Sequence, residues 1–78
     1  MLGGGPLDRF MLSQSRVIAK GRRIRDVMGL VQDYGGTVGG WVKKSSPRLY
    51  RGSVSYEYHW YEHRGIGRKE LCLVKVSP

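Results

Sequence analysis

The segment Val54–His63, VSYEYHWYEH, constrains the fold of this chain more than any other. It is rich in aromatic and β-branched residues and contains no Gly or Pro, which is typical of a β-strand. Side chains alternate between the two faces of a strand. The alternation predicts a core face with Val54, Tyr56, Tyr58 and Trp60 and a second face with Ser55, Glu57, His59, Tyr61 and His63. The second face carries a run of groups that can transfer protons.

One or two helices are predicted in the first half of the chain. Pro6–Leu12 could form one or two turns, and Arg16–Lys20 is too short to assign. In Arg22–Tyr34 the apolar residues recur at helical spacing, and the glycine pair that follows is a typical helix stop.

The second half is predicted to form an antiparallel sheet. Three further strands are expected at Thr37–Lys43, Leu49–Arg51 and Lys69–Val76, with a loop at 45–47 and a glycine-bearing hairpin loop at Arg64–Arg68. The fold class is therefore α+β, with one or two N-terminal helices packed on a three- or four-stranded antiparallel sheet.

The length of 78 residues suits one domain. We expect a flexible leader at 1–5, because it is rich in glycine, and a single domain at 6–78. No signal peptide or membrane-length apolar run is visible. Cys72 is the single cysteine, so no disulfide can form within the chain, and its apolar neighbours predict a small buried side chain.

The charge balance indicates a polyanionic partner. Fourteen Lys and Arg against six Asp and Glu give a formal net charge of +8. Phosphate backbones are the usual partners of such a surface, ahead of acidic proteins or anionic membranes. Arg22, Arg23 and Arg25 are expected at the N-terminal end of the second helix, where they and the helix dipole would attract the same phosphate. An ordinary solvated basic face is an equally open interpretation.

The two histidines of the aromatic strand do not predict a metal site. His59 and His63 are four residues apart, which on a strand is roughly 13 Å, too far to share one ion. His63 adjoins the hairpin loop and is expected at the surface. His59 lies in mid-strand, where a packed structural histidine and a catalytic one are both open. No metal and no cofactor are expected.

Cleavage of RNA would use these groups without a metal. The 2′-hydroxyl is an internal nucleophile, so the enzyme supplies an acid, a base and cations for the charge that develops on the phosphate. His59 suits the acid or base role, with Glu57 or Glu62 as its partner and Tyr61 as a proton donor or stacking group. The cations that could hold phosphate are Lys43, Lys44, Arg51 and Lys75.

The segments "DYGGTVGGWVKKSS" and "HWYEHRGIGRKELCLVKV" resemble C-terminal toxin domains of bacterial polymorphic toxins, including contact-dependent inhibition and Rhs-type effectors. The nuclease modules of these effectors are often assigned to the barnase/EndoU/colicin/RelE-like group of RNases. The resemblance covers 24–76 and implies N-terminal helices on a four-stranded antiparallel sheet. It marks Lys43 and His59 as catalytic, followed by Tyr61 and Glu62, although strand alternation places Glu62 on the core side.

The resemblance also implies partners and a setting. It implies delivery as part of a larger secreted effector, action in the cytoplasm of the target cell, and RNA, with tRNA foremost, as substrate. A small acidic immunity protein would block the site, which makes the chain a monomer or one half of a toxin–immunity heterodimer.

Three other classes of function stay open from the sequence. The first is a non-catalytic basic RNA-binding module, because exposed aromatics and cations serve stacking and phosphate contact equally well. The second is an interaction domain whose charge serves solubility. The third, a DNase, would normally need a metal cluster, for which the acidic residues are few and scattered.

Overall fold

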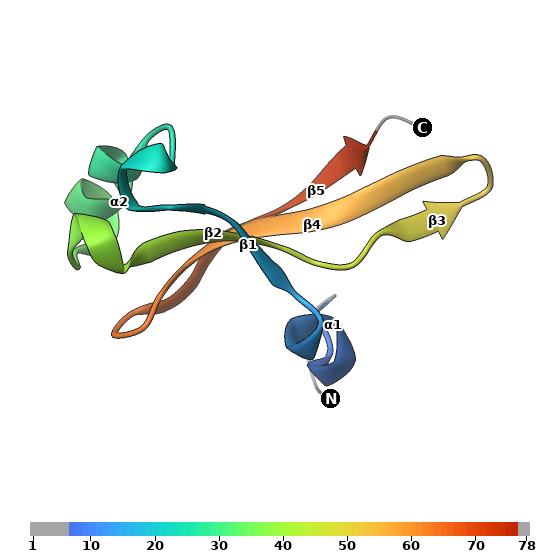
Figure 1. The fold of residues 1–78 in the computed structure, drawn as a ribbon, viewed down its shortest axis with the longest axis horizontal. Coiled ribbons are helices and arrows are strands. Elements are labelled where there is room, and N and C mark those ends of the chain that lie inside the picture. Colours follow the sequence, from blue (N-terminus) through green and yellow to red (C-terminus); the bar gives the residue numbers. More distant parts are fainter. Residues whose placement is uncertain (1–6, 77–78) are drawn as a thin grey trace.

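The chain folds into an antiparallel sheet with short helices at two places along it (Figure 1). The structure, a computed structural model, describes residues 7–76, so the leader and Pro6 lie outside the described residues. The elements in order are α1 (Arg9–Ser13), β1 (Arg16–Lys20), η1 (Gly21–Arg23), α2 (Val27–Tyr34), η2 (Val38–Gly40), β2 (Trp41–Ser45), β3 (Leu49–Arg51), β4 (Val54–His63) and β5 (Gly67–Val76). The predicted α+β class is confirmed. Neither α-helix is long and apolar enough to cross a bilayer.

Strand β4 is the centre of the sheet. β5 pairs along almost its whole length, from Ser55↔Val76 to His63↔Gly67. β2 and β3 both pair with the other side of β4, β2 over the half that ends at His63 and β3 over the half that begins at Val54. β1 then adds to the outer side of β2, and every pairing is antiparallel. The predicted strand Val54–His63 and its hairpin to β5 are thus confirmed.

Strand β1 is the element that the sequence left unassigned. Its five residues are mostly exposed and carry no strong periodicity. They form a strand because β2 offers a free edge, on which β1 pairs from Arg16↔Ser45 to Lys20↔Val42. The sheet therefore has five strands, with β2 and β3 following one another beside β4.

The main core lies on the face of the sheet opposite to the predicted one. Ile24, Val27 and Leu30 bury their side chains against Trp41 at the start of β2. Tyr61 packs against this cluster, so the face of β4 that carries the odd-numbered residues is the one that α2 covers. We call it the α2 face. Among the residues of β4 on the opposite face, Trp60 is buried, whereas Val54, Tyr56 and Tyr58 are half-exposed.

The second helix begins later than predicted. α2 starts at Val27, and Asp26 is its N-cap, with Oδ1 accepting the Gly29 N–H at 3.2 Å. Arg22 and Arg23 lie in η1, before the helix. The prediction that these arginines lie at the N-terminal end of the second helix is therefore wrong for Arg22 and Arg23, whereas Arg25 directly precedes the Asp26 cap. The same contact accounts for Gly29, since a Cβ there would collide with the Asp26 carboxylate.

The histidine at the end of β4 is packed instead of lying free at the surface. The His63 ring meets Trp41 edge-on, at 5.3 Å between ring centroids. Its Nε2 and Nδ1 lie 3.2 and 3.1 Å from the N–H groups of Thr37 and Gly65. A Cβ on Gly36 or Gly40 would collide with this ring. These glycines belong to the η2 region, so β2 starts at Trp41 and not at Thr37.

Alanine substitution in η2 tests this packing. Gly40→Ala would push a methyl group into the His63 ring, whereas a Cβ at Gly39 meets no atom within 4 Å. We expect Gly40→Ala to lower the free energy of unfolding by about 1–3 kcal/mol, measured by urea denaturation. Gly39→Ala is the matched control and should change it by less than about 0.5 kcal/mol. Equal losses in both variants would contradict the packing described here.

Candidate functional site

The α2 face holds a buried carboxylate at Glu57 in mid-strand. Its side chain is only 7% exposed. It accepts hydrogen bonds from Ser45 Oγ at 2.8 Å and His59 Nε2 at 3.1 Å. The guanidinium groups of Arg16 and Arg48 approach within 3.3 and 3.5 Å. Hydrogen bonding from His59, helped by Ser45 and Arg16 and opposed by burial, lowers the pKa of Glu57 to about 2.

The buried carboxylate orients the His59 ring. His59 and Glu57 are two residues apart on one strand, so both side chains lie on the α2 face. Because Glu57 is ionised, it accepts a proton-bearing Nε2 and leaves Nδ1 as the nitrogen that can exchange a proton. Within residues 7–76 Nδ1 has no hydrogen-bond partner, and no buried side-chain nitrogen there is left unsatisfied, so Nδ1 reaches solvent. The side chain is 19% exposed.

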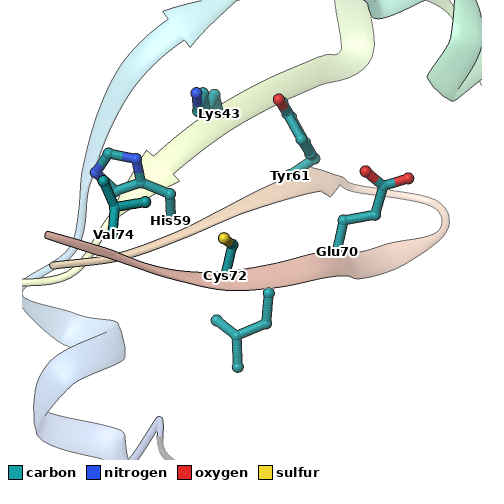
Figure 2. A pocket seen from close by; sticks show the side chains of 7 residues that line it. Lys43, His59, Tyr61, Glu70, Cys72 and Val74 are labelled. Atoms are coloured by element: carbon teal, nitrogen blue, oxygen red, sulfur yellow. The ribbon is translucent and has the colours of Figure 1, made fainter.

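A pocket of about 390 Å³ opens beside His59 on this face. Side chains from β2, β4 and β5 line it (Figure 2). They are Lys43, His59, Tyr61, Glu70, Leu71, Cys72 and Val74. Lys43, His59 and Tyr61, which the sequence analysis named as candidates, thus meet in one pocket. Glu57 does not line the pocket but contacts His59.

Lys43 and Tyr61 are direct neighbours across the β2–β4 pair. The Lys43 ammonium lies 5.7 Å from the centre of the Tyr61 ring, within the range of a cation–π contact. Burial, followed by the negative charge of Glu70, raises the pKa of Tyr61. The phenol therefore stays protonated near neutral pH and can donate a hydrogen bond.

Glu62 lies outside this pocket, on the opposite face. It accepts the Trp60 Nε1–H at 3.1 Å and pairs with the Lys44 ammonium at 3.9 Å. Strand alternation had predicted that Glu62 lies on the same face as Trp60. The position of Glu62 outside the pocket gives no support to the catalytic role that the resemblance implied. Lys44 lies on the same opposite face because it pairs with Trp60 across the strands.

The remaining cations named from the sequence are spread over the surface. Arg22 and Arg23 in η1, and Arg25 just after it, are exposed beside α2. Arg51 ends β3 at the far hairpin, and Lys75 on β5 pairs with Tyr56, so both belong to the other half of the sheet. None of these five side chains lines the His59 pocket.

Sequence reasoning missed several parts of the site. Arg16 was hidden in the unassigned strand β1, and no local signal placed Arg48 next to Glu57. Cys72 is exposed and lines the pocket, so its predicted burial is wrong: β5 is an edge strand, and α2 does not cover this part of it. Counting alternate residues along the last strand would have placed Glu70 on the same face as Cys72. Which residues of β4 lie opposite Glu70 could not be counted in this way, because the pairing of β5 with β4 is irregular at this point.

In the part of the chain that the structure describes, no three His, Cys, Asp or Glu side chains are arranged to hold a metal ion. Comparisons with models of protein families, with curated proteins and with solved structures found no match to this chain.

The buried carboxylate predicts an acid-dependent stability. The pKa of Glu57 lies at about 2 in the folded chain against 4.5 for the free group, so its stabilisation is complete above pH 4.5 and is lost as the pH falls through about 2. We expect Glu57→Gln to lower the free energy of unfolding by about 3 kcal/mol at pH 7 and by far less near pH 2. Urea denaturation at both pH values measures this difference.

The control is Glu62→Gln, which removes a more exposed carboxylate on the opposite face. Its effect should be under about 1 kcal/mol, as for surface ion pairs. A Glu57→Gln penalty that is the same at pH 7 and pH 2 would contradict the role assigned to the ionised carboxylate.

Proposed function

We propose that this domain is a metal-independent endoribonuclease that cleaves RNA by attack of the 2′-hydroxyl on the adjacent phosphate. The observation that carries the proposal is the His59 ring, held through Nε2 by the buried Glu57 and lining an open pocket with Lys43 and Tyr61. A carboxylate that fixes one ring nitrogen leaves the other as a positioned acid or base.

The chemistry of RNA matches what the pocket offers. RNA brings its own nucleophile, so the protein needs only groups that move protons and groups that stabilise charge on the phosphate. Lys43 provides a positive charge, and the protonated Tyr61 phenol provides a hydrogen-bond donor in the same concavity. The formal net charge of +8 favours the approach of a polyanion.

The proposal extends to the setting in which such a domain acts. The resemblance to toxin domains of polymorphic effectors supports tRNA as substrate, delivery from a larger effector and action in the cytoplasm of a target cell. An acidic immunity protein that covers the His59 pocket would complement the charge of the domain and associate rapidly.

Cleavage assays on His59 variants test the enzymatic assignment. The purified domain, incubated with total tRNA in EDTA, should produce fragments with cyclic-phosphate ends. His59→Ala should reduce the cleavage rate by about 100-fold or more, because it removes the proton-transfer group. Its affinity for RNA, measured by fluorescence anisotropy, should stay within about threefold of wild type. Intact RNA at high concentrations of the wild-type domain would contradict the enzymatic assignment. The anisotropy measurement would then separate a non-catalytic RNA-binding module from an interaction domain that does not bind RNA.

The adjacent lysines of β2 offer a matched pair of variants. Lys43 faces the pocket, and Lys44 lies on the opposite face beside Glu62, so each alanine variant removes the same charge. We expect Lys43→Ala to slow cleavage by about 100-fold through the loss of transition-state stabilisation. Lys44→Ala should slow it by no more than about threefold at physiological salt, the effect of one distant charge. Similar losses in both would show that the lysines act only through general electrostatics.

A further inference from the structure

Strand β5 carries an irregularity beside the pocket. His59 pairs with Cys72, but Tyr61 pairs with Lys69, so β5 has one residue more than β4 between these pairs. The extra residue makes a β-bulge, a feature that is common next to active sites because it re-aims side chains. Glu70 lies in this bulge with φ at 58°, and it is the one residue other than glycine with a positive φ in the range 7–76.

The strained backbone at Glu70 directs its carboxylate into the pocket. Glu70 lines the same concavity as His59, Tyr61 and Lys43 (Figure 2). The hydroxyl of Tyr34, the last residue of α2, donates a hydrogen bond to Glu70 Oε2 at 2.9 Å. A conformation that side chains other than glycine rarely adopt persists when the surrounding structure imposes it, and such residues gather at functional sites.

The other described glutamates cannot take a proton from a substrate in this pocket. Glu57 is buried and already accepts hydrogen bonds from Ser45 and His59. Glu62 lies on the opposite face of the sheet. Glu70, in contrast, is an exposed residue whose side chain reaches the pocket.

We propose that Glu70 is the general base of the reaction and that His59 is the general acid. This inference rests on the proposed function. In an in-line displacement the attacking and leaving oxygens lie on opposite sides of the phosphorus, so the base and the acid must flank the phosphate. Figure 2 shows His59 and Glu70 toward opposite ends of the pocket, with Lys43 and Tyr61 between them.

Glu70 and His59 account for both proton transfers of the cleavage reaction. Glu70 takes the proton of the 2′-hydroxyl as the 2′ oxygen forms its bond to phosphorus. The bond from phosphorus to the 5′ oxygen breaks, and His59 Nδ1 gives that oxygen its proton. The products are a 2′,3′-cyclic phosphate and a 5′-hydroxyl, and both side chains return to their starting states by exchange with solvent. Lys43 and Tyr61 stabilise the charge on the non-bridging oxygens.

Two substitutions at Glu70 test the assignment. Glu70→Gln keeps the size of the side chain and removes its basicity, so cleavage should fall by about 100-fold or more while RNA affinity changes by less than about threefold. Glu70→Gly should also abolish cleavage, but glycine accepts the positive φ, so the urea midpoint should equal or exceed that of wild type. A catalytic loss without a loss of stability is a signature that a merely structural role would not produce.

The matched control is Asp33→Asn, which makes the same change of charge at an exposed position of α2 and outside the pocket lining. It should cleave within about threefold of wild type. Cleavage by Glu70→Gln close to that of an active wild type would overturn the role of Glu70 and leave the nuclease proposal standing. Failure of the wild type itself to cleave RNA would overturn both proposals.

Discussion

A carboxylate buried in the middle of the sheet is the constraint on which the rest of this structure depends. Removing the Glu57 charge from water costs several kcal/mol unless partners compensate it. The partners come from separate elements: Ser45 from β2, His59 from β4, Arg16 from β1 and Arg48 from the link between β2 and β3. The partners of the charge on β4 are therefore complete only when β1, β2 and the link that follows β2 are in place, which couples the edge strand to the centre of the sheet.

The same carboxylate links the fold to the proposed chemistry. The contact between Glu57 and Nε2 fixes the orientation of the His59 ring. Nδ1 is then the ring nitrogen that is left to exchange a proton. At the other end of the pocket, α2 orients Glu70 in the way that Glu57 orients His59, because the Tyr34 hydroxyl donates a hydrogen bond to the Glu70 carboxylate. The two ends are thus positioned by different elements, and Tyr34 itself packs beside the buried Trp41, with 6.0 Å between the ring centroids.

The sequence was informative about features that depend on local backbone geometry, such as the face of a strand on which a side chain lies. The alternation in Val54–His63 correctly grouped Glu57, His59 and Tyr61 on one face and placed Glu62 on the other. It could not tell which face is covered, because Tyr and Trp suit a core and a half-exposed surface equally well. The core was therefore assigned to the wrong face. β1 could not be predicted from the sequence because it becomes a strand by pairing with the free edge of β2. The later start of α2 depends on the Asp26 cap.

By itself, the sequence determined the α+β class, the central strand and its hairpin, the excess of positive charge and the presence of His59, Tyr61 and Glu57 on one side of a strand. These properties follow from side-chain alternation, turn residues and formal charge, which are local. Only the tertiary structure decided that Lys43 and Glu70 share a pocket with His59, that Glu57 is buried and ionised, and that Glu70 adopts a positive φ. Strand register, a bulge and the desolvation of a charge arise from contacts between distant segments.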